Sequence, residues 1–377
     1  MSEPLSKIPG GMRYYFGAEA RLRRTVEDAA MAVFNGWSYE EITTPTVDYY
    51  ALFEHGMGRR EAHRAFRFTD TDGLMLALRP DVTSSVARAA ATLFAERQRP
   101  LRLCYAASVF RQQSQSHAQW RREQAQTGCE LIGAGEEVAD MEVLAIACEV
   151  LQRLGFGGKY SITLNNVEIF NGIAESLSLS SHLRDEMRQL IDTRNGVDLE
   201  RFLIPYTSLE ERRAFARLTQ LSGKRATLDE ALPVITNPRS RAALARLERL
   251  WRVIESLDLT EHFEIDLGDV SGLDYYTGLT FKIYVSGAGN SCGSGGRYDR
   301  LTSNFGKAEP AIGFVLDIDA LTDVLMSCTG PSSFGPMPEQ SAPSIANDDR
   351  TALFLEAMDK RAVGERVLIN SGGVRLS

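Results

Sequence analysis

The 377-residue chain has few cysteines, no long apolar run and no excess of basic residues. Its five cysteines are scattered and none belongs to a Cys-x-x-Cys pair, which argues against a disulfide framework and against a zinc ribbon. No stretch reaches the ~18 apolar residues of a membrane helix, and the amino terminus lacks the apolar core of a secretory signal. We therefore expect a cytoplasmic protein without a membrane segment or a metal centre.

Acidic residues outnumber basic ones, 50 to 42, which leaves a formal net charge of −8. Proteins whose main task is to grip a nucleic acid usually present a net basic face, so this balance argues against such a role. Hydrophobic residues make up 44% of the chain and charged residues 24%. These values exclude a disordered chain, a collagen-like fibre and a coiled-coil rod, and the length allows two or three domains.

Strand-like and helix-like segments alternate in the first part of the chain. Residues 18–35 have the apolar spacing of an amphipathic helix, with Gly36 as its stop. Residues 37–45 alternate like a strand that ends at a proline. Two further strands are predicted at 101–111 and 121–133, and the polar loop between them indicates a long hairpin. Helices are expected at 84–97 and 137–153 and a strand at 160–164.

The sequence pattern changes after residue 167. Residues 168–260 are mostly helical in pattern and rich in Leu, Arg and Glu, which indicates an inserted helical subdomain. Strand character returns at 263–267, 279–285 and 311–316, and a helix follows at 317–326. We therefore predict an α+β fold, with helices on a mainly antiparallel sheet and one helical insertion. The glycine-rich run 286–296 does not open a helix in a strand–helix–strand unit, so a dinucleotide fold is not indicated.

Four motifs carry the clearest functional signal, namely LRPDVT (78–83), FRQQ with RREQAQTGCE (110–130), SGLDYYTGLTFK (271–282) and GSGGRYDRL (293–301). Together they resemble the core of the class II aminoacyl-tRNA synthetases, specifically histidyl-tRNA synthetase, from about residue 8 to residue 322. LDYYTG followed by GGRYD is the most specific part, because these are the histidine-recognition motifs of that family. The resemblance implies a class II synthetase-like antiparallel sheet, flanked by helices, in a homodimer.

The same resemblance assigns the three class II motifs and a division of the chain. Helix 18–35 with strand 37–45 is similar to motif 1, the hairpin 101–133 to motif 2, and residues 311–321 take the place of motif 3. The implied division of the chain is a synthetase-like core at 1–167 and 261–329, a helical insertion at 168–260, and a linker with a short C-terminal segment at 330–377.

The resemblance also implies a pocket for L-histidine. Asp81, Thr83 and Gln126 would hold the α-ammonium group, with Asp81 standing where the synthetases have glutamate. A carboxylate with neutral acceptors is the right chemistry for a cation. Glu130 and Tyr276 would bracket the imidazole, whose nitrogens need polar partners. The remaining members of the implied histidine-binding set are Arg111 at the carboxylate, Tyr298 closing the pocket, and Tyr275.

The activation machinery of the family is incomplete in this sequence. Arg111 matches the motif 2 arginine, but Ser271 and Ala320 stand where the other two arginines would be, and Asp317 replaces the usual motif 3 glycine. If each lost contact costs ~3 kcal/mol, the rate falls by ~10⁴-fold. The resemblance therefore implies no catalytic residues, no cofactor and no aminoacylation.

The segment after residue 321 is shorter than the ~100 residues of an anticodon-binding domain, so we expect none and no binding of tRNA. A synthetase-like core of this kind resembles the regulatory subunits of short-form ATP phosphoribosyltransferase, the first enzyme of histidine biosynthesis. That family joins the short catalytic subunit in a hetero-octamer, activates it and mediates feedback inhibition by histidine. Such feedback needs a site whose ligand binds two quaternary states unequally.

Other interpretations stay open from sequence. The chain could be a divergent histidyl-tRNA synthetase-like adenylating enzyme or an RNA-sensing pseudo-synthetase. At the level of residues, Arg111 could be a surface salt-bridge residue, and Tyr275 and Tyr276 could be aromatics at the rim of the core. The glycines at 293–296 could form only a tight turn between strands. His117, in the polar loop, is expected to be solvated.

Overall fold

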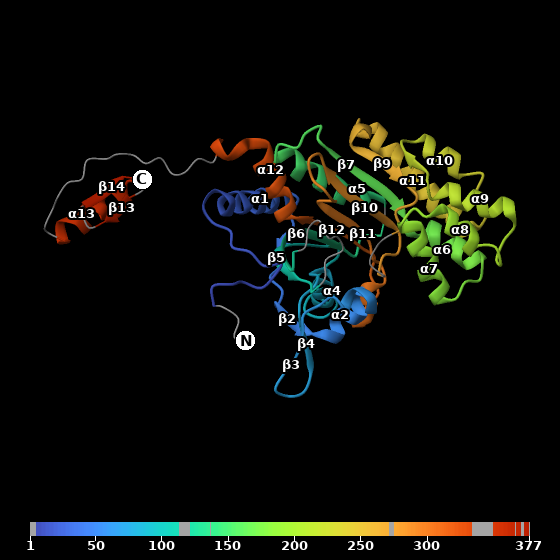
Figure 1. The fold of residues 1–377 in the computed structure, drawn as a ribbon, viewed down its shortest axis with the longest axis horizontal. Coiled ribbons are helices and arrows are strands. Elements are labelled where there is room, and N and C mark those ends of the chain that lie inside the picture. The colour runs from blue at the N-terminus through green and yellow to red at the C-terminus, as the bar shows by residue number, and fades with distance from the viewer. Residues whose placement is uncertain are drawn as a thin grey trace.

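The computed structural model describes residues 5–112, 121–135, 137–270, 275–333, 350–365, 367–370 and 373–376. The centre of the fold is a nine-stranded sheet, shown in Figure 1. Its strands, in spatial order, are β1 (Glu40–Glu41), β5 (Leu101–Phe110), β6 (Glu123–Ile132), β12 (Ala311–Asp317), β11 (Gly293–Arg297), β10 (Leu279–Val285), β7 (Tyr160–Asn166), β9 (Phe263–Asp266) and β8 (Ser222–Gly223).

All neighbouring strands run antiparallel except for the pairs β1–β5 and β7–β9, near the two ends of the sheet. The predicted α+β class with a mainly antiparallel sheet is therefore confirmed. The expected strand at 37–45 is wrong in extent, because only Glu40 and Glu41 pair with β5. The alternation there reflects the burial of Tyr39 and Thr44 against the core rather than a continuous ladder.

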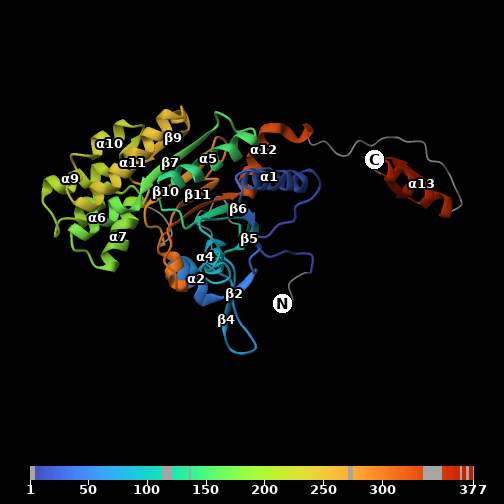
Figure 2. The same ribbon diagram turned by 180° about the vertical axis from the view of Figure 1, so that it is seen from behind.

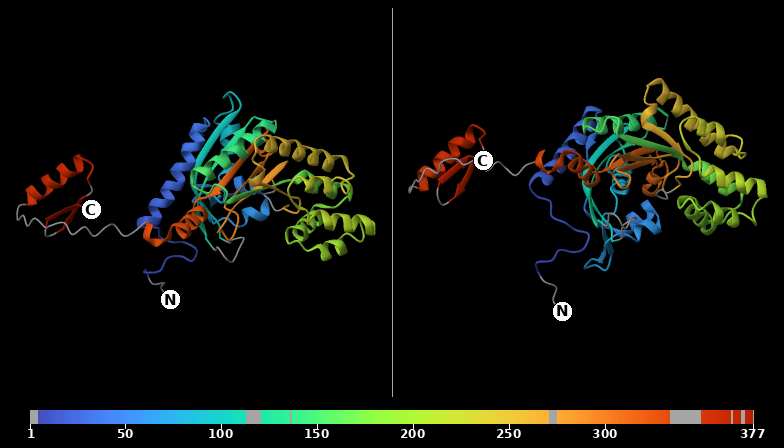
Figure 3. Two further views of the ribbon diagram at one scale, coloured as in Figure 1. Left: turned by 90° about the horizontal axis from the view of Figure 1, so that it is seen from above. Right: turned by 45° about the horizontal axis from the view of Figure 1, so that its top comes forward.

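Three helices lie side by side over one face of the sheet, as Figures 1 and 3 show. They are α1 (Gly17–Gly36), α5 (Glu137–Arg153) and α12 (Ile318–Ser333). The buried residues of α1 recur every three or four positions, from Leu22 to Phe34, so a single stripe faces the sheet. Phe34 meets Phe314 of β12 edge to face, with ring centroids 5.9 Å apart. Helix α1 runs through Gly36 and ends there.

A smaller unit below the other face was not predicted from sequence. It contains α2 (Tyr50–Met57), α3 (Arg59–Ala62) and a three-stranded sheet of β2 (Val47–Tyr49), β4 (Met75–Leu78) and β3 (Arg67–Thr69). These strands are too short to show a period. Helix α4 (Thr83–Ala91) packs beside this unit and ends six residues before the predicted end, where the chain continues in turns.

The glycine-rich run enters the sheet instead of forming only a turn. Gly293, Gly295 and Gly296 belong to β11, between β12 and β10. A Cβ atom at Gly293 would lie 2.6 Å from the Val315 carbonyl oxygen, and one at Gly296 would lie 2.6 Å from the Leu279 carbonyl oxygen. The strands therefore approach too closely for any larger residue, which is why glycine is needed here.

Residues between β7 and β9 form the short β8, a 3-10 helix (Thr260–His262) and six α-helices, at the end of the molecule opposite to α12 in Figure 1. The α-helices are α6 (Val167–Ser176), α7 (Ser181–Asp192), α8 (Gly196–Phe202), α9 (Leu209–Leu218), α10 (Ala226–Ala231) and α11 (Pro238–Ser256). Helix α11 packs on α6, α5 and β7, so its buried Leu247 and Trp251 join the hydrophobic core of the sheet. The helical segment is thereby anchored to the body that carries the site.

The chain continues past the core in a small C-terminal element. Helix α12 extends beyond the predicted 317–326, as far as Ser333. Residues 334–349, part of the predicted linker, lie outside the described residues. The final elements are α13 (Arg350–Ala362) and the paired strands β13 (Val367–Asn370) and β14 (Gly373–Leu376), which stand apart from the main body in Figure 2. No described helix combines the length and the apolarity needed to cross a membrane.

Candidate functional site

The predicted histidine-binding residues come from segments far apart in the chain that meet on the α4 side of the sheet. Thr83 is the first residue of α4, and Gln126 and Glu130 share one face of β6, four residues apart. Tyr298 follows β11 and Tyr276 precedes β10. The antiparallel order β6–β12–β11–β10 therefore places the two sequence motifs with tyrosines near the motif 2 strand.

Glu130 is the centre of this cluster. Its Oε1 accepts hydrogen bonds from the Thr83 hydroxyl at 2.8 Å and from the Tyr105 hydroxyl at 3.4 Å, and its Oε2 accepts one from the Tyr298 hydroxyl. The side chain is buried, and a Cβ atom at Gly313 of β12 would overlap its carboxylate. Burial raises the pKa of Glu130 to about 7, although the hydrogen bonds from Tyr298 and Thr83 oppose that shift.

Tyr105 was not among the predicted site residues. It lies on β5 opposite Gly128, whose missing side chain leaves room for the tyrosine ring. A Cβ atom at Gly128 would lie 2.8 Å from the Tyr105 hydroxyl. The pairing of the two strands could have pointed to Tyr105. A glycine directly opposite a large aromatic residue on the neighbouring strand indicates that the aromatic ring lies over the glycine.

Asp81 lies just before α4 and is buried. Its carboxylate accepts hydrogen bonds from the Ser84 amide at 3.3 Å and from the Ser84 hydroxyl at 3.2 Å. Burial raises the pKa of Asp81 to about 6, while Ser84 and the nearby charge of Arg111 lower it. Ser84, which sequence reasoning missed, therefore holds the carboxylate in position at the first turn of the helix.

Arg111 is tied into the site rather than exposed at the surface. Its Nε donates to the Pro80 carbonyl oxygen at 3.0 Å, and its Nη1 donates to Gln124 Oε1 at 3.2 Å. Gln124 Nε2 in turn donates to Asp317 Oδ2 at 3.5 Å. This chain of contacts connects the motif 2 arginine to the position of the missing motif 3 glycine. Burial lowers the pKa of Arg111.

The tyrosines form an aromatic wall beside the carboxylates. The ring of Tyr275 meets that of Tyr276 at 5.0 Å and that of Tyr298 at 5.7 Å between centroids, both edge to face. A Cβ atom at Gly296 would lie 2.8 Å from the Tyr276 ring, so the glycine of the GGRYD motif makes space for it. Gln126 is buried on the Glu130 face of β6. The glycine of the GGRYD motif thus leaves the space that the tyrosine of the LDYYTG motif occupies.

The motif 3 segment carries the carboxylate of Asp317 where the family has a glycine, and Ala320 where it has an arginine. Asp317 Oδ1 accepts from the Ala320 amide at 2.9 Å, and burial raises the pKa of Asp317 to about 6. Asp319 is held by the Arg23 Nε at 2.7 Å and by the Ala125 amide at 3.0 Å. Position 320 itself offers only a buried methyl group. The other replaced position, Ser271, lies outside the described residues.

The raised pKa of Glu130 predicts how stability depends on pH. Between about pH 4.5 and pH 7 the folded protein holds a proton on Glu130 that the unfolded chain has lost, so the free energy of unfolding falls as the pH rises. The expected contribution is about 3 kcal/mol. Urea unfolding at pH 5 and at pH 7.5 measures it, and Glu130→Gln is expected to lose less stability than the wild type over this interval. An equal loss in both proteins would contradict the assignment.

No group of three or more His, Cys, Asp or Glu side chains in the described ranges is arranged to hold a metal ion. The chemistry of the cluster is that of a binding site for a small polar molecule. It combines two buried carboxylates, one guanidinium and an aromatic wall, a set suited to a small molecule that carries both cationic groups and a carboxylate.

Comparison with known proteins identifies the family of the chain. The family model of histidyl-tRNA synthetase matches residues 11–321. The ATP phosphoribosyltransferase regulatory subunit of Moorella thermoacetica is 34% identical over 97% of this chain and 92% of its own length. The regulatory subunit of the same name from Desulfitobacterium hafniense is 33% identical, over 96% and 91% respectively.

Solved structures show the same relationship. An ATP phosphoribosyltransferase regulatory subunit/histidyl-tRNA synthetase from Bacillus halodurans superposes with a TM-score of 0.82 and 29% identity, covering 96% of this chain and 92% of its own. Histidyl-tRNA synthetase from Nostoc superposes with a TM-score of 0.75 at 20% identity, over 98% and 86%, which shows the shared fold. The chain therefore belongs to the histidyl-tRNA synthetase-like family of ATP phosphoribosyltransferase regulatory subunits.

Proposed function

We propose that this protein is a non-catalytic regulatory subunit of ATP phosphoribosyltransferase that binds L-histidine in the cluster around Glu130. Family membership supports the regulatory role in histidine biosynthesis. One observation carries the histidine assignment. The carboxylates and tyrosines that would form the amino-acid pocket lie together, whereas the motif 3 position that would face ATP holds Asp317 and Ala320.

Each of the three polar parts of histidine, namely the α-ammonium group, the carboxylate and the imidazole, would contact a different set of side chains. Asp81, Thr83 and Gln126 would receive the α-ammonium group, and the Arg111 guanidinium would receive the carboxylate. Glu130 and Tyr276 would hold the imidazole nitrogens. Glu130 already accepts hydrogen bonds from three hydroxyl groups, whereas a carboxylate can accept about four, so the imidazole would compete with these hydroxyls for the remaining acceptor positions. Displacement of the Tyr298 hydroxyl by the imidazole would move one ring of the aromatic wall.

Regulation follows if the two arrangements of this cluster favour different quaternary states. We propose that the protein forms a homodimer, assembles with the short catalytic subunit in a hetero-octamer, activates that subunit and transmits feedback inhibition by histidine. A coupling of ~1–3 kcal/mol between the histidine site and the assembly suffices for such control. The described cluster rests on α4, β6 and β10, so a shift of the wall can be passed to rigid elements.

Co-purification tests the partnership. The protein and a short catalytic subunit are expected to co-elute from a size-exclusion column, and phosphoribosyl transfer is expected to rise on mixing and to fall when histidine is added. Catalytic activity that is the same with and without this chain would contradict activation. Inhibition by histidine that is unaffected by Tyr276→Ala would contradict the feedback role of this pocket.

Histidine is expected to raise the melting temperature of the isolated protein, because a ligand that binds only the folded state stabilises it. Tyr276→Ala should abolish most of that shift by removing one wall of the pocket. Tyr276→Phe, which keeps the ring and loses only the hydroxyl, should retain part of it. Differential scanning fluorimetry with and without histidine measures all three. A shift in Tyr276→Ala equal to that of the wild type would mean that histidine binds elsewhere.

A further inference from the structure

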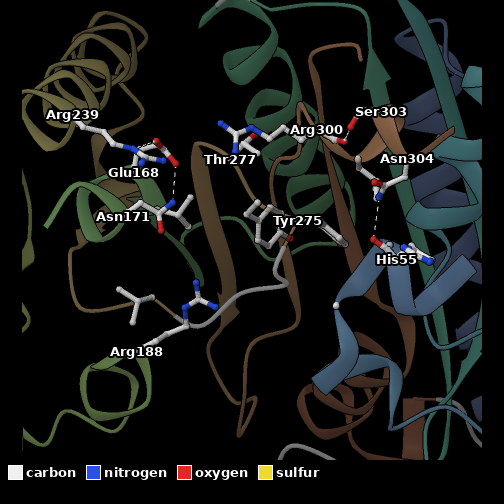
Figure 4. Close-up of a pocket in the computed structure, with 16 residues that line it drawn as sticks. His55, Glu168, Asn171, Arg188, Arg239, Tyr275, Thr277, Arg300, Ser303 and Asn304 are labelled. Atoms are coloured by element: carbon white, nitrogen blue, oxygen red, sulfur yellow. Dashed lines mark hydrogen bonds and ion pairs between the residues drawn. The ribbon is translucent and has the colours of Figure 1, made fainter. Parts of the chain in front are cut away.

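A cavity of about 460 Å³ lies between the synthetase-like core and the helical segment, close to the aromatic wall (Figure 4). Helices α6, α7 and α11 supply one side of its lining, and α2 with the short 3-10 helix η3 (Leu301–Phe305) supplies the other. Among the predicted histidine-binding residues, only Tyr275 and Tyr276 also line this cavity. Its other lining residues have no part in the proposed histidine pocket.

The charged side chains of the lining are mainly cationic. The lining contains three arginines, Arg188, Arg239 and Arg300, and a single carboxylate, that of Glu168. The pKa of Glu168 indicates whether the electrostatic potential in the cavity is positive or negative. Although burial alone would raise its pKa, hydrogen bonds from Arg239 and Asn171 and the charges of Arg239 and Arg300 lower it. The cavity therefore favours negative charge.

The three guanidinium groups differ in what already holds them. Arg239 is fixed by Glu168 at 2.6 Å and by Glu175 at 2.7 Å. Arg188 lies over the ring of Phe170, 5.5 Å from its centroid. The exposed Arg300 side chain makes no hydrogen bond or ion pair with any described residue, and Figure 4 shows it extended toward Glu168. Arg300 is thus available to a ligand, while Arg239 keeps the opposite side in position.

We propose that this cavity binds a small phosphate-bearing anion. One guanidinium group can donate two parallel hydrogen bonds to two oxygens of a phosphate, and the cavity volume lies in the range of small-molecule sites. The Asn171 amide adds a neutral donor to the lining, because only one of its two N–H groups is needed for the hydrogen bond to Glu168 Oε1 at 2.8 Å. The ring of Tyr275 offers an apolar surface for the sugar or base of a phosphorylated metabolite. This site goes beyond the proposed histidine site and does not require it.

Calorimetric titration of the full chain with inorganic pyrophosphate and with ribose 5-phosphate tests the proposal, at an ionic strength held constant with sodium chloride. Saturable binding of at least one probe is expected. Arg300→Met should weaken it about tenfold or more, the usual effect of losing a hydrogen bond to a charged group. The matched control is Arg213→Met, an exposed arginine on α9 that does not line the cavity, and it should bind as the wild type does.

Arg188→Met is the second variant, because it removes a cation from another wall of the cavity. It should also weaken binding, with unchanged far-ultraviolet circular dichroism. The proposal is overturned if neither probe binds the wild type, or if both Arg300→Met and Arg188→Met bind as tightly as Arg213→Met. The histidine-induced shift of the Tyr276 series is a separate measurement, so the failure of either site is distinguishable from the failure of the other.

Discussion

Incubated with histidine, ATP and labelled pyrophosphate, this protein is expected to exchange pyrophosphate about 10⁴-fold more slowly than an active histidyl-tRNA synthetase. Activation places developing negative charge on the α-phosphate of ATP, which needs cations around it. Arg111 is present, but position 320 carries a methyl group and Ser271 replaces the second arginine. Two lost contacts of ~3 kcal/mol each give the expected factor.

The structure adds a repulsive group to this loss. Asp317 connects through Gln124 to Arg111, and above its pKa of about 6 it places a negative charge near the motif 2 cation. A histidyl-tRNA synthetase measured in the same assay is the positive control. Sustained exchange well above the background without enzyme would contradict the non-catalytic assignment and favour the divergent adenylating enzyme.

Replacing Glu130 by alanine is expected to weaken the binding of histidine by about 100-fold or more. Removing one partner of a buried charged pair costs about 3–5 kcal/mol, because the other partner is left buried and unpaired. In the ligand-bound state that other partner would be the imidazole, and the Thr83 and Tyr298 hydroxyls would lose their acceptor as well. Calorimetric titration with histidine measures the affinity.

Two variants make this experiment specific. Glu130→Gln keeps the size and an acceptor oxygen, so its loss should be smaller than that of alanine. Glu142→Gln changes a carboxylate on α5 that is bound by Arg102 and Tyr39 and does not belong to the proposed pocket. It should leave the affinity for histidine unchanged. Wild-type affinity in Glu130→Ala, with a cooperative unfolding transition, would show that Glu130 does not contact the ligand.

Much of the architecture could be predicted because it depends on local periodicity. The apolar stripe of α1, and the early Asp140 and Glu142 with the late Arg153 of α5, indicate helices whose limits agree with the structure to within one residue. The hairpin of β5 and β6 was likewise visible as two strand patterns around a polar loop. The unit of α2 and β2–β4 was missed, since three- or four-residue strands carry no measurable period.

The candidate site was predictable only in part. Asp81, Glu130 and Tyr276 stand in motifs that resemble a known family, so their positions in sequence sufficed to propose them. Tyr105 lies within the motif 2 hairpin and Ser84 directly follows LRPDVT, but neither was singled out, and they became visible only when strand pairing and the first turn of α4 placed their hydroxyls beside carboxylates. A sequence motif identifies individual residues, whereas the hydrogen-bond partners of those residues depend on which segments of the chain come together in the folded protein.

The sequence by itself therefore determined the fold class, the identity of the proposed ligand residues and the loss of the motif 3 arginine. Only the tertiary structure decided their protonation and their surroundings. The pKa of Glu130 is raised because β5, β12 and α4 together remove water from it, and no local pattern encodes that burial. The cavity beside Tyr275 exists for the same reason, since helices and η3 from distant parts of the chain enclose it.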